Sequence, residues 1–120
     1  MELSIDTSTR QASIGLSQNG DIIAKNSWKS EQNHSKECFP KIIDLLEKTN
    51  LKSSDIHAVF VSKGPGGFSA LRVGISIAKS FAIGSKIPIV GVSSLDIEAY
   101  EFINDSKTVW AVINAGFNKI

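Results

Sequence analysis

The chain has 120 residues, of which 42% are hydrophobic, and its 13 Lys and Arg nearly balance 12 Asp and Glu, leaving a formal net charge of +1. This length fits one domain with a core of moderate size, and the near-neutral charge excludes a polybasic nucleic-acid binder, whose affinity comes from many phosphate contacts. The single cysteine, Cys38, excludes an intramolecular disulfide. No apolar segment has the length of a membrane span or of a signal-peptide core, so the cytoplasm is the expected location.

The first 28 residues predict an antiparallel meander of three strands. Apolar and polar residues alternate in "ELSID" (2–6) and in "QASIGL" (11–16), which is the period of a half-buried strand. Asn19-Gly20 predicts a tight hairpin turn, because both residues tolerate positive φ. A third strand is therefore expected over about 21–28.

Helical spacing of apolar residues predicts a first helix between His34 and Thr49. Pro40 lies inside this segment, where it removes a backbone donor and clashes with the preceding turn. We therefore expect either a kink or a later start of the helix. The apolar positions are Cys38, Phe39, Ile42, Ile43, Leu45 and Leu46.

The rest of the chain alternates strands with helices. "HAVFVSK" (57–63) and "IPIVGV" (87–92) predict strands, and a helix over 69–83 lies between them, with Gly84 as its C-terminal cap. A third helix over about 94–104 is expected from a capping-box pattern at its start, and "KTVWAVI" (107–113) predicts a last strand. This order predicts an α/β fold, in which helices pack on a mixed sheet that contains the meander.

"GPGGFSALRVG" (64–74) has the composition of a phosphate-binding loop, but not its spacing. The Walker pattern requires a lysine that reaches the terminal phosphates and a hydroxyl for magnesium; Gly64 is followed five positions later by Ser69, with no lysine nearby. The dinucleotide pattern requires a third glycine where Ser69 stands. A phosphate role for this loop therefore stays the weaker interpretation.

The predicted helix after this loop has apolar residues on nearly two sides, whereas a helix that covers a sheet needs one apolar stripe. Gly74 and Ala78, four residues apart, would let another helix approach closely. That helix is either the first helix of the same chain or part of a second subunit, and the pattern supports both equally. One side consists of Leu71, Gly74, Ile75, Ala78 and Ala82, and the other of Ala70, Val73, Ile77 and Phe81.

A polar turn follows the first predicted strand. It presents one carboxylate and three hydroxyls, from Asp6, Thr7, Ser8 and Thr9. These groups could hold magnesium and phosphate, although an ordinary turn, in which they bond to the backbone, explains them more simply.

His34 and Cys38 are four residues apart on the first predicted helix, so their side chains could touch. A Cys–His nucleophile also needs an orienting group and an oxyanion hole, and the sequence shows neither. Two such residues do not make a zinc site. We therefore predict no catalytic residue and no metal site.

Four segments together resemble a known family. They are "IDTST" (5–9), "HSKECFPKIIDLL" (34–46), "KGPGGFSALRVGISIAKSFA" (63–82) and "IPIVGVSSLDIEA" (87–99), in this order and at the right spacing. The chain resembles the TsaB family, also called YeaZ, which takes part in making threonylcarbamoyladenosine on tRNA. The resemblance covers residue 3 to about residue 116, and about half of a typical member.

The resemblance implies one lobe of the actin-like, ribonuclease-H-like ATPase fold. Residues 1–106 would form this N-terminal lobe, and residues 107–120 would begin a truncated second lobe. In that class the turn at residues 6–9 corresponds to the first phosphate loop. Many members have Asp where Asn114 stands, so no role passes to that residue.

The resemblance also implies a function without catalysis by this chain. TsaB-like proteins bind the catalytic subunit TsaD through their first two helices, form homodimers through the same surface when TsaD is absent, and join a complex with the ATPase TsaE. We therefore expect a scaffold that contacts tRNA only indirectly and requires no cofactor itself, with ATP or ADP and magnesium at the complex. The expected contact residues are His34, Cys38, Lys41, Leu45, Leu71, Gly74, Ile75 and Ala78.

Two other functions remain open. One is a nucleotide-binding or phosphotransfer lobe that uses Asp6 with Thr7 and Thr9. The other is a glycoprotease-like peptidase, which requires a nucleophile–base pair or a metal.

Overall fold

The structure is a computed structural model that describes residues 1–30 and 34–100, with side chains described again from Lys36 onward. Strands and helices alternate after an N-terminal group of three strands. In chain order the elements are β1 (Glu2–Asp6), β2 (Gln11–Gln18), β3 (Asp21–Lys29), α1 (His34–Lys48), the short 3₁₀ helix η1 (Ser53–Asp55), β4 (Ala58–Gly64), α2 (Phe68–Ser85), β5 (Ile89–Ser93) and α3 (Ser94–Ala99).

The described strands form one mixed sheet in the order β3-β2-β1-β4-β5. β1 pairs antiparallel with β2 and parallel with β4, so that Ile5 lies opposite both Ile14 and Val61. β2 pairs antiparallel with β3, and β4 pairs parallel with β5. The predicted meander and mixed sheet are confirmed, and Asn19 and Gly20 form the hairpin turn with φ of 53° and 85°.

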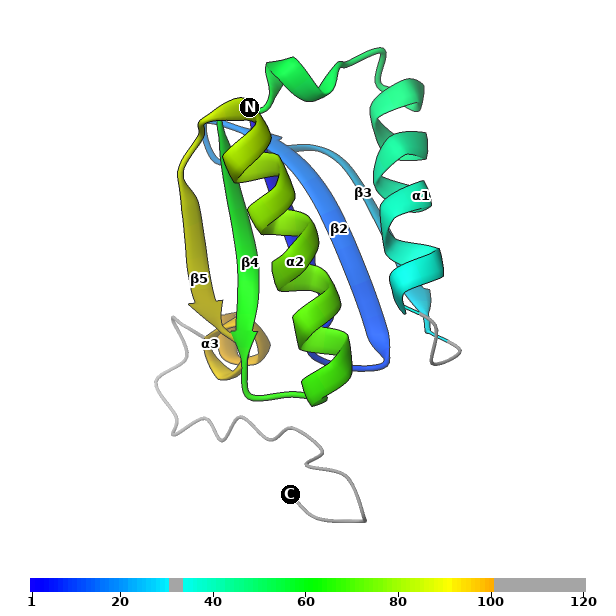
Figure 1. The fold of residues 1–120 in the computed structure, drawn as a ribbon, viewed down its shortest axis with the longest axis vertical. Helices are drawn as coiled ribbons and strands as arrows, with labels where there is room; N and C mark the ends of the chain where they lie inside the picture. Colours follow the sequence, from blue (N-terminus) through cyan, green and yellow to red (C-terminus); the bar gives the residue numbers. More distant parts are fainter. Residues whose placement is uncertain (31–33, 101–120) are drawn as a thin grey trace.

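The core lies between the sheet and two helices on one of its faces. α1 and α2 run side by side in the same direction across this face (Figure 1). Alternate residues of the strands point toward the helices, as a period of two requires. The buried cluster consists of Leu3, Ile5, Ile14, Leu16, Cys38, Ile42, Leu45, Leu46, Ile56, Val59, Val61 and Ala78.

α1 begins at His34 and contains Pro40, so the predicted later start of this helix is wrong. Pro40 is exposed and leaves the carbonyl group four residues earlier without its usual helical donor. Burial of the apolar side of α1 against the sheet outweighs this local cost, because most helical stability in proteins comes from packing.

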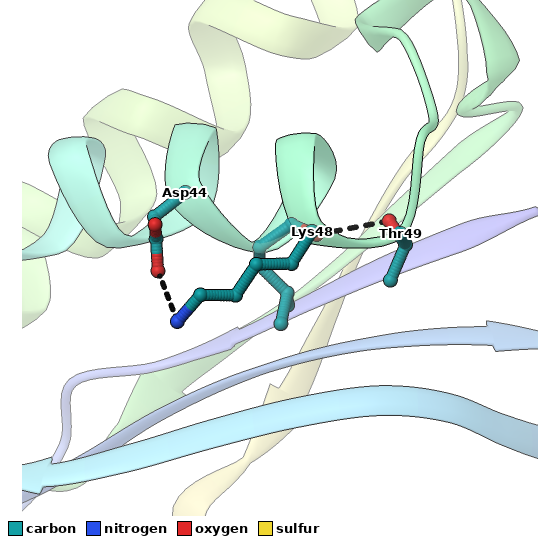
Figure 2. Close-up of polar contacts among 4 residues, drawn as sticks. Asp44, Lys48 and Thr49 are labelled. Atoms are coloured by element: carbon teal, nitrogen blue, oxygen red, sulfur yellow. Dashed lines mark hydrogen bonds and ion pairs between the residues drawn. The ribbon is translucent and has the colours of Figure 1, made fainter.

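Hydrogen bonds close the C-terminal end of α1. The Thr49 hydroxyl donates to the carbonyl oxygens of Leu45 and Leu46 at 2.9 and 3.1 Å. The Lys48 ammonium lies 2.9 Å from the Asp44 carboxylate (Figure 2). Asn50, which follows Thr49, takes a positive φ of 58°, which is a common way to end a helix. The carbonyl groups of Leu45, Leu46 and Glu47 thus keep backbone donors as the chain turns back toward β4.

α2 ends later than the sequence predicted. Gly84 lies inside the helix and Lys86 is the cap, in the left-handed conformation with φ of 55° and ψ of 47°, so the prediction of Gly84 as the cap is wrong. The amide of Ile87 donates to the carbonyl of Ala82 at 3.0 Å. Ile87 also packs against the core, and Pro88 directly after it disfavours helical backbone at Ile87.

Replacing Lys86 with glycine is expected to stabilise the fold by about 0.5–1 kcal/mol, because glycine adopts the left-handed conformation without a steric cost. Urea unfolding monitored by circular dichroism measures the change. Lys79→Gly, at an exposed position inside the same helix, is the control and should destabilise by about 1 kcal/mol. Equal effects of the two replacements would contradict the importance of the Lys86 conformation.

The last described element, α3, starts at the predicted residue. Its N-cap, Ser93, makes no side-chain hydrogen bond, so the expected capping contact does not form. The predicted extension of this helix to residue 104, the strand over 107–113 and the second lobe lie outside the described residues. None of the described helices has the length and apolar character needed to cross a membrane.

Candidate functional site

The polar turn after β1 and the glycine loop after β4 meet at one end of the sheet. β1 and β4 are parallel neighbours, so both segments leave the sheet at the same edge. A side chain at Gly66 would overlap the backbone of Ser8, whose Cα would lie 2.9 Å from its Cβ. Gly64 takes a φ of +115° and precedes a cis peptide bond to Pro65. The loop is therefore rich in glycine because its backbone packs directly on the turn.

The side chains of the turn are occupied by hydrogen bonds within the chain. The Thr7 hydroxyl is fully buried and donates to the carbonyl of Ala70, in the first turn of α2, at 2.7 Å. The Thr7 amide donates to the Ser62 hydroxyl at 3.3 Å. The amide and hydroxyl of Ser8 both donate to one carboxylate oxygen of Asp6, at 3.0 and 2.6 Å. This geometry supports the turn interpretation, and the phosphate role of residues 6–9 stays a prediction.

Gly74 lies where α2 crosses the sheet. A Cβ at this position would be 2.5 Å from Thr7 Oγ1 and 3.5 Å from Ile5 Cγ2, and Ala78 is fully buried. These small residues let α2 approach the sheet rather than another helix. Their side of α2 is covered by β1 and β4 within the chain, and the contact of Gly74 and Ala78 with a partner stays a prediction.

The inner side of α1 is buried in the same way. Cys38 is fully buried and Leu45 is 6% exposed, so both side chains face the core of this chain, and their contact with a partner stays a prediction. Burial raises the pKa of the Cys38 thiol to about 11, and the nearby Glu37 carboxylate adds to the effect. The side chain of His34 lies outside the described residues, so the structure does not test the His34–Cys38 pair.

Three of the predicted contact residues lie at the edge between the core and the surface. Lys41 is half-buried, and its ammonium lies 5.0 Å from the centre of the Trp28 ring. Leu71 and Ile75 are half-buried, and Ile75 packs against the core. These three side chains are therefore only partly accessible to a partner.

An apolar groove runs between α1 and α2 on the outer surface. Its volume is about 430 Å³, and it is lined by Phe39, Ser69, Arg72, Val73, Ser76 and Ile77. Phe39 is 47% exposed and lines the groove together with Val73 and Ile77, and contiguous apolar side chains on a surface can mark an interaction site. We call these six residues the α1–α2 groove.

The sequence predicts the two helices that form this groove but not the groove itself. Val73 and Ile77 belong to the second apolar side that the sequence showed on α2, and the structure confirms that this side is left partly open. Phe39 was read only as one of the apolar positions of α1. In the structure Phe39 lies between the buried Cys38 and the exposed Pro40, on the outer side of α1.

The opposite face of the sheet carries a second hollow, of about 650 Å³. Short polar residues of β1 and β2 form its floor, and apolar side chains of β4, β5 and α3 form one wall, among them Phe60, Val92, Ile97 and Tyr100. Among the described residues, no three His, Cys, Asp or Glu side chains gather closely enough to hold a metal ion.

Comparison with known proteins connects this fold to one group. The family described as "TsaD: tRNA N6-adenosine threonylcarbamoyltransferase" matches residues 23–120. The chain is 34% identical over 93 residues to the tRNA threonylcarbamoyladenosine biosynthesis protein TsaB of Escherichia coli, covering 78% of this chain and 40% of that protein. The chain spans about half the length of the curated relatives that it matches, from 40% to 57%.

Solved structures agree with these matches. YeaZ from Pseudomonas aeruginosa superposes with a TM-score of 0.79 at 27% identity, over 87% of this chain and 48% of that one. RuvC from Thermus thermophilus superposes with a TM-score of 0.52 at 9% identity, over 82% of this chain, and this second likeness is one of fold alone.

Proposed function

Because the chain belongs to the TsaB (YeaZ) family and has its actin-like, ribonuclease-H-like fold, we propose that it takes part in threonylcarbamoyladenosine modification of tRNA. Its role there is that of a non-catalytic scaffold, which binds and activates a TsaD-like catalytic subunit. The observation that carries the proposal is the α1–α2 groove, an open apolar surface on the two helices through which such a scaffold would bind.

The chemistry of the groove supports a protein ligand. Its lining combines the apolar side chains of Phe39, Val73 and Ile77 with two serines and a single charged side chain, Arg72. Phenylalanine and arginine are among the residue types enriched at the cores of protein–protein interfaces. The polar turn at residues 6–9, by contrast, uses its hydroxyls inside the chain.

Further parts of the proposal concern the assembly. A TsaE-like ATPase would join the complex, tRNA would contact this chain only indirectly, and the same surface would form homodimers when the catalytic subunit is absent. ATP or ADP with magnesium would bind at the complex rather than to this chain alone. Such an assembly would work in the cytoplasm.

Replacing Phe39 with aspartate tests the proposal. In light scattering coupled to size-exclusion chromatography, the wild-type chain is expected to form a 1:1 or 2:2 complex with the TsaD-like protein of the same organism. Phe39→Asp should weaken that complex by at least about tenfold, because a buried aromatic ring contributes about 1.5–3 kcal/mol and the carboxylate must be desolvated.

Ile22→Asp is the matched control, because Ile22 is 68% exposed and borders the hollow on the other face of the sheet. It should leave the complex unchanged. An unaffected complex with Phe39→Asp would move the interface elsewhere. Absence of any complex with the wild-type chain would contradict the scaffold role itself.

A further inference from the structure

Asn19 and Gly20 form the tip of the β2–β3 hairpin. Gln18 pairs with Asp21 across this tip, so the turn has only two residues, and both take a positive φ, of 53° and 85°. Both are exposed, and apart from the chain neighbours of Gly20, no atom lies within 4 Å of the place where its Cβ would stand. The turn therefore stands in water, with nothing packed on it.

An asparagine that precedes glycine can lose its side-chain amide without an enzyme. The backbone nitrogen of the next residue attacks the side-chain carbonyl carbon and forms a new carbon–nitrogen bond. The amide group leaves as ammonia, together with the proton of the attacking nitrogen, and a five-membered succinimide ring results. Water then opens this ring at either of its carbonyl groups, which gives aspartate or isoaspartate. Glycine favours the attack because it has no Cβ to crowd the approach of its backbone nitrogen.

The other described asparagines are better protected. Asn50 also takes a positive φ, of 58°, but the amide that follows it, on Leu51, donates to a carbonyl group of α1 at 2.9 Å. Asn26 lies inside β3, where strand pairing holds its backbone extended. The Gly20 amide, by contrast, makes no backbone hydrogen bond in the part of the chain that the structure describes. Among the described residues, Asn19 alone combines exposure, a free following amide and a following glycine.

We propose that Asn19-Gly20 is a spontaneous modification site, at which the folded chain is converted to aspartate and isoaspartate as it ages. The paired strands hold the turn in one conformation, so the attack requires a local opening of the hairpin tip. Such an opening does not require the core to unfold, because proteins open locally at much lower cost than globally. This inference is independent of the function proposed in tRNA modification.

The two products have different effects on the hairpin. Aspartate enters the left-handed conformation about as readily as asparagine, so the turn keeps its geometry. Isoaspartate runs the main chain through the side-chain carbon and adds one methylene group to a two-residue turn, and the register of a hairpin depends on the length of its loop. The pairing of Gln18 with Asp21 is then lost first, next to the register shift that already lies between Leu16 and Ser17.

The test incubates the chain at pH 8 and 37 °C and follows it by peptide mapping with mass spectrometry. Methylation by a protein-L-isoaspartate methyltransferase detects the isoaspartate. We expect both products at residue 19 before any change at Asn26 or Asn50. The free peptide LSQNGDII (16–23) should react at least about tenfold faster, because the open form of the folded tip is a minor state.

Asn19→Gly is the decisive variant, because Gly-Gly also suits this turn and carries no side-chain amide. It should lose the isoaspartate signal and unfold in urea like the wild type. Asn50→Gly, at the other described asparagine with positive φ, is the matched control and should keep the signal. Hydrogen exchange of the separated isoaspartate fraction should show a loss of protection at residues 17–22, with unchanged protection in β1 and β4.

Three outcomes would contradict the inference. An intact Asn19 after the free peptide has been fully converted would overturn the site itself. An isoaspartate signal of wild-type strength in Asn19→Gly would place the reaction elsewhere in the chain. Conversion at residue 19 with no loss of protection in the isoaspartate fraction would overturn the opening of the hairpin tip.

Discussion

Gly74→Leu is expected to unfold the isolated chain or to destabilise it by at least about 3 kcal/mol, at the upper end of the cost of overpacking a core. The first atom of the new side chain would lie 2.5 Å from Thr7 Oγ1, and the rest would enter the space between α2 and β1. Neither neighbour can move easily, because Thr7 is buried and bonded to Ala70. Thermal and urea unfolding monitored by circular dichroism measure the effect.

The same helix contains a matched control. Gly84 has no atom within 4 Å of the place where a Cβ would stand, so Gly84→Ala should stabilise α2 by about 0.5–1 kcal/mol through helix propensity. A double-mutant cycle sharpens the test: Thr7→Ala removes the two atoms closest to Gly74, so Thr7→Ala and Gly74→Ala together should cost less than their sum. Additive effects would show that the contact with Thr7 does not limit position 74.

Cys38 is expected to react with a thiol reagent at pH 8 at least about 100-fold more slowly in the folded chain than in the unfolded chain. Burial raises its pKa from 9.0 to about 11, which lowers the thiolate fraction at pH 8 by about that factor, and only the thiolate reacts. The rate of 5,5′-dithiobis(2-nitrobenzoate) consumption, with and without 8 M urea, measures the difference. Fast labelling of the folded chain would revive the peptidase alternative, which requires a reactive nucleophile.

The same pKa shift predicts how stability depends on pH. The folded chain keeps the Cys38 proton more tightly than the unfolded chain, so this contribution is complete below pH 9 and is lost as pH rises to about 11. The loss amounts to about 2–3 kcal/mol. Other groups titrate in this range, so the comparison is with Cys38→Ala, whose stability should fall less steeply over the same interval.

The sequence predicted those parts of the fold that depend on local patterns. The alternation of apolar and polar residues predicted β1 and β2, and Asn19-Gly20 predicted the hairpin that joins β2 to β3. Each of these signals acts within a few residues. The end of α2 was predicted wrongly because that prediction also used only a local signal. A glycine at position 84 suggested a cap, whereas the helix continues to Ser85 with Lys86 as its cap, and the next residue, Ile87, packs against core residues distant in sequence.

The candidate site was harder to predict because α2 is apolar on two sides. Periodicity identifies an apolar side but does not say which of two such sides faces the sheet. Gly74 and Ala78 were assigned to the outside because small residues also suit helix–helix contacts. The deciding fact is the position of Thr7 against Gly74, which depends on the parallel pairing of β1 with β4 and is not visible in either segment alone.

The contacts of Thr7 can form during synthesis only after the ribosome has released Ser62 and Ala70. β2 follows β1 directly in the chain, but the hydrogen bonds of Thr7 to Ser62 and Ala70 span 55 and 63 residues. At about 5–20 residues per second, a ribosome needs several seconds to supply that intervening length. The central strand of the sheet therefore waits with one edge unpaired until β4 and α2 emerge. In this interval the nascent meander is most exposed to chaperones and to wrong strand partners.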